Sequence, residues 1–228
     1  MIATVTLTFN RLESLKGCIN SIRAAHVEQI IVVDNHTTDG TAEWLANQSD
    51  IFTVRLPENR GVIARNFGFN ICHHAIRYVA QIDDDVVMLP NWADTMVQAI
   101  QQDPSVIATG QCGGYVGDFS GLVPRPDLPV GTYVDTLTGF VWMLDRRRIE
   151  AGNSWACVQY DEAFGFRWHE ESDLQCTLRT RTGMKLITCP RVADHHSQAG
   201  PVDWVLHNAN LARLAHKWNG VIQSEEPR

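Results

Sequence analysis

Residues 78–85 read Tyr-Val-Ala-Gln-Ile-Asp-Asp-Asp, five residues typical of a buried strand followed by three consecutive carboxylates. Crowded like charges repel one another, so the cluster indicates a site that receives a cation. Because side chains alternate along an extended chain, Asp83 and Asp85 share one face and Asp84 lies on the other. Carboxylate oxygens suit Mg²⁺ or Mn²⁺, ions that keep open positions for substrate phosphates. The stretch therefore predicts a metal site for phosphate chemistry.

On both sides of this stretch, the first hundred residues alternate between strand and helix patterns. The expected strands span residues 2–9, 29–33, 52–56 and 78–82, and the expected helices span 11–24, 39–46, 61–76 and 91–101. The less regular second half indicates strands at 106–109, 136–144 and 185–188, and helices at 170–182 and 204–218. Strands separated by helices form parallel sheets, and continuously apolar strands are covered on both faces. We expect an α/β fold with a mostly parallel sheet.

The composition limits the classes of protein that this chain can belong to. With 228 residues, 44% of them hydrophobic, it fits a single α/β domain. A net charge of −7 argues against a surface that binds nucleic acid over the whole protein. No apolar run reaches the roughly 18 residues that span a bilayer, so we expect no integral membrane segment. Six cysteines without a CxxC pair, and no leader before the first strand, predict reduced thiols in a cytoplasmic protein.

Polar residues follow each of the first four expected strands, where parallel α/β sheets bind their ligands. These segments are Thr8 to Arg11, Asp34-Asn35, Asn59 to Gly61, and the aspartate cluster. The sequence has no GxxxxGK[ST] loop, and no GxGxxG follows the first strand. The commonest nucleotide-triphosphatase and dinucleotide-binding interpretations are therefore excluded.

Five motifs in order resemble those of a family 2 glycosyltransferase of the GT-A type. They are Thr8-Phe9-Asn10-Arg11, Val33-Asp34-Asn35 with Asp39-Gly40-Thr41, residues 59–66, Asp83-Asp84-Asp85, and Glu170-Glu171-Ser172-Asp173-Leu174. The resemblance spans residues 1 to about 200 and implies one GT-A, Rossmann-like domain over 1–228. Residues 1–105 would form the nucleotide-sugar-binding half, 106–200 the acceptor and catalytic half, and 201–228 a C-terminal helix and tail.

The resemblance also implies a nucleotide-diphospho-sugar donor, with a UDP-sugar as the first expectation, and an acceptor that is a glycan or a small molecule. It implies that the base and ribose lie near Thr8, Asn10 and Asp34, and that Arg65 and Asn66 help to hold the donor. Two of these residues have a structural alternative. Asp34 could cap the turn before a helix, and an arginine on a helix that packs on the sheet is commonly structural.

The metal site implied by the resemblance contains Asp85 as the preferred Mn²⁺ or Mg²⁺ ligand and Asp83 as a ribose or metal partner. Asp84 is expected to tolerate replacement best. A histidine further along the chain would contact the metal or the diphosphate. The segment Asp194-His195-His196 offers two candidates, of which His196 is preferred and His195 stays open.

The acidic pair Glu170 and Glu171 opens an expected helix, where acidic side chains are stabilised by the helix dipole without any catalytic role. The resemblance indicates the second acid, Glu171, as the general base, and leaves Glu170 as the alternative. In that role Glu171 would deprotonate the acceptor hydroxyl as its oxygen attacks the anomeric carbon, and inversion would follow.

The acceptor region is expected in the glycine- and proline-rich residues 111–132. Aromatic side chains elsewhere in the second half could stack on a sugar or fill the core. The candidates are Trp142, Trp155, Phe164, Phe166 and Trp168.

Two other functions compete with a glycosyltransferase. Asp83-x-Asp85 also matches the aspartate-nucleophile phosphatases, but in those enzymes the motif ends the first strand, and here it ends the fourth. The other is a non-catalytic sugar- or nucleotide-binding protein on the same fold, which Asp83, Asp85 and Glu171 together disfavour.

Overall fold

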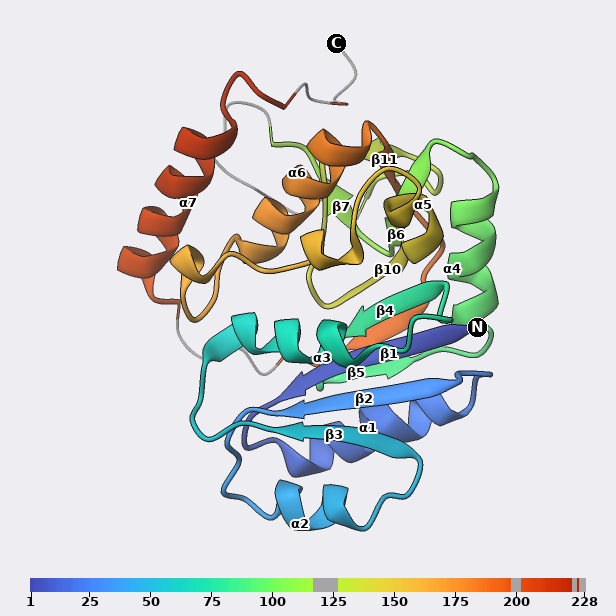
Figure 1. Ribbon diagram of the computed structural model, residues 1–228, viewed down its shortest axis with the longest axis vertical. Coiled ribbons are helices and arrows are strands. Elements are labelled where there is room, and N and C mark those ends of the chain that lie inside the picture. The colour runs from blue at the N-terminus through green and yellow to red at the C-terminus, as the bar shows by residue number, and fades with distance from the viewer. Residues whose placement is uncertain (117–126, 198–201, 223–224, 226–228) are drawn as a thin grey trace.

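A computed structural model describes residues 1–116, 127–197, 202–222 and 225 of the chain (Figure 1). One sheet has eight strands in the order β3-β2-β1-β4-β10-β6-β11-β8. Their bounds are β1 Ile2–Thr8, β2 Gln29–Asp34, β3 Ile51–Arg55, β4 Tyr78–Ile82, β6 Val106–Gly110, β8 Tyr133–Val134, β10 Val141–Asp145 and β11 Lys185–Thr188. Two small sheets pair β5 Val86–Met88 with β12 Ala193–His195, and β7 Gly113–Gly114 with β9 Thr136–Leu137.

The helices among the described residues are α1 Leu12–Arg23, α2 Thr41–Ala46, α3 Arg65–Ile71, α4 Trp92–Gln101, α5 Arg146–Glu150, α6 Glu170–Thr182 and α7 Trp204–Trp218. Short 3₁₀ turns cover Gly61–Ala64, Trp155–Cys157 and Glu162–Phe164. No helix in these parts of the chain is both long and apolar enough to cross a bilayer.

The sheet is mixed and mostly parallel, as the alternating pattern predicts. Strands β3, β2, β1 and β4 run parallel, and β11 runs parallel to β6. Strand β10 lies antiparallel between β4 and β6. In the parallel half, Thr8 pairs with Asp34 and Asp34 with Arg55, so these strands end at one edge. The polar residues that follow the strands therefore gather at that edge.

Helices cover both faces of the sheet (Figure 1). One core contains Leu15 and Ile19 of α1 and Met96 of α4, all fully buried. The other core contains Phe69 of α3 and Leu174 of α6. Burying these apolar helix faces against the sheet is the main favourable contribution to folding. The expected α/β fold in a single domain is confirmed.

Two expected elements are interrupted, and both interruptions affect the site. The helix expected over 61–76 is a 3₁₀ turn followed by α3, which ends at Ile71. The strand expected over 136–144 is broken at 138–140, between β9 and β10. In this break the carbonyls of Gly139 and Phe140 accept hydrogen bonds from the Gln81 side chain (2.8 Å) and the Asp83 backbone (2.9 Å). The break therefore lies beside the aspartate cluster.

Candidate active site

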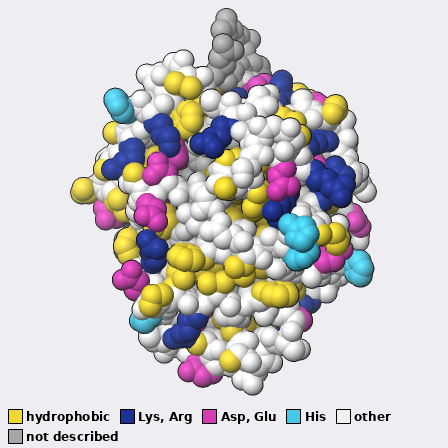
Figure 2. Space-filling model, in the orientation of Figure 1, with side chains coloured by type: hydrophobic (Ala, Val, Ile, Leu, Met, Phe, Trp, Pro, Cys, Tyr) yellow, Lys and Arg dark blue, Asp and Glu magenta, His cyan; other side chains and the backbone are white. Residues whose placement is uncertain are grey.

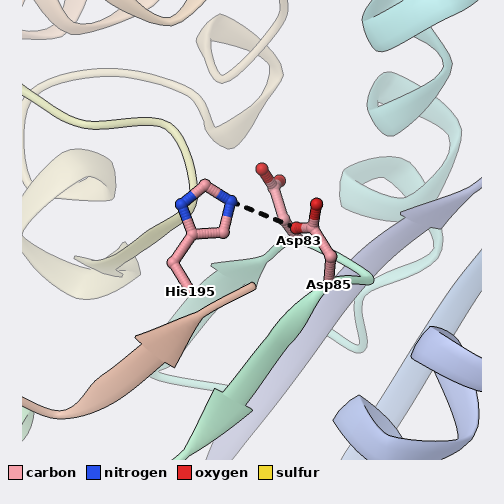
Figure 3. Close-up of side chains that lie close together, drawn as sticks. All are labelled: Asp83, Asp85 and His195. Atoms are coloured by element: carbon pink, nitrogen blue, oxygen red, sulfur yellow. Dashed lines mark ion pairs between the residues drawn. The ribbon is translucent and has the colours of Figure 1, made fainter. Parts of the chain in front are cut away.

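Asp83 and Asp85 follow β4 and converge with His195 at the end of β12 (Figure 3). One ligand atom from each of these side chains lies within 4.8 Å of the others. The His195 Nε2 atom is 3.2 Å from Asp85 Oδ1. Two carboxylate oxygens and one imidazole nitrogen fit a divalent cation such as Mn²⁺. Asp83 and Asp85 thus lie on one side of the chain, as their alternation predicts, and His195 joins them there.

The pairing of β12 with β5 decides which histidine joins the aspartates. His195 lies opposite Val86, directly after Asp85 in sequence. The next residue, His196, is exposed and only its backbone N–H contacts the cluster, donating to the Asp85 carbonyl at 2.9 Å. Successive side chains of a strand point to opposite sides, so only one of the two rings can face the aspartates. The preference for His196 is corrected: the structure places His195 at this site.

Asp84 lines the same cleft as Asp83 and Asp85 but is not one of the three grouped side chains, and its contacts argue against the expectation that it tolerates replacement best. It is buried, and its carboxylate accepts a hydrogen bond from the Thr8 hydroxyl at 2.8 Å. Arg11 Nη1 lies 3.1 Å from Asp84 and 3.1 Å from Asp85. Burial raises the pKa of Asp84, and Arg11 opposes that rise. Asp84 therefore ties the end of β1 to the end of β4.

Arg65 lies between the aspartates and the acidic pair. Its guanidinium is buried and forms an ion pair with Asp83, and its Nη1 atom is 3.9 Å from Glu171 Oε1. Burial raises the pKa of Asp83 to about 6, against the lowering effect of Arg65. Burial lowers the pKa of Arg65, but Asp83 and other acids outweigh it and hold the pKa above its ordinary value. Arg65 therefore stays charged.

Glu170 and Glu171 begin α6 in different environments. Glu170 is almost completely buried, and burial, followed by the charge of Glu171, raises its pKa well above the ordinary value. Glu171 is half-buried and lines the cleft described below. It packs against Gly139, where an added Cβ would lie 2.5 Å from Glu171 Oε1. Both acids line that cleft, and Glu171 is the more exposed of the two.

These groups share one cleft of about 1050 Å³. Its wall includes the segment after β1, the aspartate cluster, the break at 138–140, the start of α6 and His207 of α7. Gly61 has a φ of 63°, and a Cβ there would lie 2.5 Å from the Phe166 backbone. The Val62 N–H also donates to the Phe166 carbonyl at 2.9 Å. This close contact joins the two halves of the chain at the cleft.

Three of the predicted donor residues do not line the cleft. Asp34 is fully buried, accepts from the Thr37 N–H at 2.8 Å and pairs with Arg55 at 2.8 Å. Asp34 thus makes the contacts of a turn-capping residue, which was the structural alternative to a role in donor binding. Thr8 donates to Asp84, and exposed Asn10 accepts from the Thr38 N–H at 2.7 Å. These three residues shape the turns next to the cleft.

Arg65 and Asn66, which were predicted to hold the donor together, lie in different surroundings. Arg65 lines the cleft, but Asn66 does not. The Asn66 side chain bonds both the N–H (2.7 Å) and the carbonyl (3.0 Å) of Tyr160. Asn66 therefore fastens α3 to the segment that leads to α6.

Sequence reasoning left Arg11 and Asn35 out of the site, yet both line the cleft. Asn35 donates from Nδ2 to Asn59 Oδ1 at 2.8 Å and accepts from the Arg60 N–H at 2.9 Å. Both residues lie within the strand-end motifs, directly next to predicted residues. The motifs therefore indicated the right segments, but the prediction chose a neighbouring residue within each segment.

The aromatic candidates divide between core and cleft. Trp142, Trp155 and Phe164 are buried in the core. Phe166 and Trp168 line the cleft, and the Phe166 residue is 56% exposed. Of the expected acceptor region, residues 117–126 lie outside the described part of the chain.

The fold is that of the GT-A glycosyltransferases. A mannosyltransferase from Pyrobaculum calidifontis, solved with GDP-Man and Mn²⁺, superposes with a TM-score of 0.66 at 15% identity, covering 98% of this chain and 65% of that one. GalNAc-T7, solved with UDP, GalNAc and Mn²⁺, superposes with a TM-score of 0.74 at 16% identity, covering 96% and 48%. At such low sequence identity, the structural similarity shows a shared fold and nothing more.

Residues 4–172 match the family model described as glycosyl transferase family 2, and the chain belongs to this family. A glucosyl-dolichyl phosphate glucuronosyltransferase of Haloferax volcanii is 28% identical over 130 residues. That match covers 54% of this chain and 40% of the relative, so the chain spans less than half of the relative's length.

Proposed function

We propose that this protein is a metal-dependent, inverting glycosyltransferase that moves a sugar from a nucleotide-diphospho-sugar to an acceptor hydroxyl. The observation that carries the proposal is the bridge made by Arg65, which pairs with Asp83 on one side and approaches Glu171 on the other. A group able to hold a metal and a group able to accept a proton are thereby held in one cleft. Family membership supplies the reaction class.

Asp83, Asp85 and His195 would hold the cation. Mn²⁺ is the first candidate, because the donor set mixes oxygen and nitrogen and both solved neighbours contain Mn²⁺. When bound, the cation supplies Lewis-acid stabilisation of negative charge on a departing diphosphate. Arg11, which lies beside Asp84 and Asp85 and lines the cleft, adds a positive charge near that position.

Glu171 is the proposed general base. It takes the proton of the acceptor hydroxyl while the oxygen forms a bond to the anomeric carbon. The bond from that carbon to the diphosphate breaks on the opposite side, and its electron pair leaves with the nucleoside diphosphate. A single displacement of this kind inverts the anomeric centre. Arg65 remains charged, and its Nη1 atom lies 3.9 Å from Glu171 Oε1, so it places a positive charge beside the proposed base.

The two solved neighbours contain GDP-Man and UDP. A UDP-sugar is the first donor to test, with GDP- and TDP-sugars beside it. Asn35 and Phe9 line the cleft next to the ends of β2 and β1 and would contact the nucleoside.

Release of nucleoside diphosphate tests the function directly. The protein is incubated with UDP-, GDP- and TDP-sugars, with and without Mn²⁺. We expect slow hydrolysis of one donor class that requires Mn²⁺ and disappears in Asp85→Asn. Absence of both turnover and donor-induced thermal stabilisation across the panel would count against a catalytic role.

A further inference from the structure

Four aromatic side chains form one part of the cleft lining, which we call the aromatic wall: Phe166, Trp168, His169 and His207. His207 comes from α7, and its ring centroid is 4.7 Å from that of His169 and 5.6 Å from that of Trp168, both with the rings tilted edge to face. The first three residues lie directly before Glu170 and Glu171 in the chain. The aromatic wall therefore adjoins the proposed base.

Helix α7 is fixed firmly enough to serve as part of a binding site. Buried Asn210 donates from one amide nitrogen to the carbonyls of Phe164 (2.7 Å), Arg167 (3.0 Å) and Trp168 (3.1 Å). At the other end of the helix, Trp218 Nε1 donates to Asp173 of α6 at 2.7 Å. On the side of the molecule where α7 lies, basic, acidic and hydrophobic side chains are interspersed at the surface (Figure 2). The helix thus holds the turn that carries the aromatic wall.

That turn has an unusual backbone. Trp168 and His169 have φ values of 80° and 68°, which bulky side chains rarely adopt. Such conformations persist only where the surroundings hold them, and they concentrate at ligand sites. Here the left-handed pair turns the chain sharply before α6 and places two aromatic rings on the cleft. Asn210 bonds the Trp168 carbonyl within this pair.

The aromatic wall also carries polar atoms that its own surroundings do not satisfy. Trp168 Nε1 and His169 Nε2 are buried and have no hydrogen-bond partner among the described residues. Burial, followed by the neighbouring His207, lowers the pKa of His169 to about 4, so its ring is neutral at pH 7. A neutral imidazole offers both a donor and an acceptor. Unsatisfied groups beside aromatic faces suit a ligand that is apolar on one side and rich in hydroxyls at its edge.

We propose that the aromatic wall is the acceptor subsite and that it takes a sugar ring, which makes the acceptor a saccharide. The proposal rests on the proposed glycosyl transfer and names its second substrate class. A sugar presents C–H groups that stack on aromatic faces and hydroxyls that bond polar atoms. A ring stacked on the aromatic wall would lie beside Glu171, which must reach the hydroxyl that reacts.

The sugar could be free or attached to an apolar carrier. The ring centroids of Trp204 and His207 are 5.3 Å apart. At the start of α7, Trp204 is 63% exposed and Val205 is 82% exposed. This apolar rim next to the aromatic wall could contact a carrier. Methyl and octyl glycosides of glucose, galactose, mannose and N-acetylglucosamine separate the two sources, because they share a sugar and differ in the aglycone.

The test measures how much each glycoside accelerates nucleoside diphosphate release from the donor that the unmodified protein hydrolyses. We expect at least one sugar to accelerate release and to appear in a glycosylated product. Equal acceleration by methyl and octyl forms indicates a sugar recognised by itself, and a larger effect of the octyl form indicates a sugar on an apolar carrier; both support the subsite. If the donor is hydrolysed but no glycoside accelerates release, the acceptor proposal is overturned and the glycosyltransferase proposal stands. If no donor is hydrolysed at all, the failure lies with the proposed function itself.

Two variants locate the effect. His207→Ala removes the α7 ring from the aromatic wall, and Phe166→Ala removes an exposed ring whose loss does not endanger folding. In each variant, we expect the acceleration by glycoside to fall. This fall should be at least tenfold larger than any fall in the rate of donor hydrolysis without glycoside. His216→Ala is the matched control, because His216 lies exposed on the same helix and outside the cleft lining. Acceleration that survives both wall variants would overturn the proposal.

Discussion

The phenyl ring of Phe140 stacks on the imidazole of His195, with centroids 4.7 Å apart and planes 10° apart. The carbonyl of the same residue accepts a hydrogen bond from the Asp83 N–H at 2.9 Å. One residue in the break between β9 and β10 therefore contacts two of the three groups that could hold a metal. It links the His195 ring at the end of β12 to the backbone of Asp83, directly after β4.

Replacing Phe140 should loosen the metal site without removing a ligand. In Phe140→Leu the backbone bond to Asp83 can persist, but the flat surface that holds the His195 ring is lost. Changes around metal ligands commonly cost about 10–100-fold in affinity, and we expect the lower end of that range. Electron paramagnetic resonance of free Mn²⁺ measures the dissociation constant. Phe52→Leu, an exposed phenylalanine on β3, is the control; equal Mn²⁺ affinities for the two variants would contradict the argument.

The two neighbouring histidines provide a second comparison. We expect His195→Ala to weaken Mn²⁺ binding by at least about 10–100-fold, because one of three converging ligand atoms disappears. His196→Ala should change the dissociation constant little, because only the backbone of His196 contacts the cluster. Isothermal titration with Mn²⁺ compares them. A greater loss in His196→Ala would restore the original preference for that residue.

The sequence predicted best those elements whose pattern is long and regular. Strand β4 over 78–82 and helix α6 over 170–182 have the expected bounds, because a continuous apolar run and a clear start signal each leave one local solution. The choice between His195 and His196 had no such signal. It depends on how a three-residue strand, β12, pairs with β5, over 100 residues away in the chain.

The same limit applies to Asp84 and Asp34. Alternation along the chain placed Asp84 opposite Asp83 and Asp85, but it could not show that the opposite side is buried against Thr8 and Arg11. Nor could it show that Asp34 is enclosed by Thr37 and Arg55. A local pattern gives the direction of a side chain, and only tertiary packing determines what the side chain meets.

Asp84 provides a prediction about stability. Asp84→Ala leaves the Thr8 hydroxyl buried without its acceptor and takes a partner from Arg11. Losing one partner of a buried hydrogen bond costs about 1–3 kcal/mol, and we expect a loss of that size in the free energy of unfolding. Urea denaturation measures it. Asp50→Ala, which breaks an exposed pair with Arg23, should cost less than about 1 kcal/mol; equal costs would show that Asp84 is not structurally important.

The acidic pair can be separated by conservative replacement. Glu171→Gln removes the proposed base and should lower the turnover number for transfer by about 10²–10⁴-fold. Glu170→Gln should cost less than about tenfold. Burial raises the pKa of Glu170 well above the ordinary value, which favours the neutral acid, and glutamine resembles that form in shape and charge. Steady-state kinetics with one donor and acceptor compares the variants. Reversal of the two effects would make Glu170 the base.

Metal binding should strengthen as the pH rises through about 6. The pKa of Asp83 in the metal-free protein is about 6, raised by burial from an ordinary value of 3.8. The folded chain thus holds this proton more tightly than the unfolded chain. The resulting stabilisation is complete below about pH 4 and is lost as the pH rises through 6. A cation needs the ionised carboxylate, so it competes with the proton and replaces the lost stabilisation.

His195 adds a second proton to this competition. Its pKa is raised above 6.5, mainly by its hydrogen bond with Asp85, and a protonated imidazole cannot bind a metal. The rise in melting temperature caused by a fixed concentration of Mn²⁺ should therefore be small at pH 5 and larger at pH 7.5. Asp83→Asn should remove the part of this dependence centred near pH 6, and His195→Ala the part above 6.5. A shift in melting temperature that is equal at both pH values would show that neither group binds the ion.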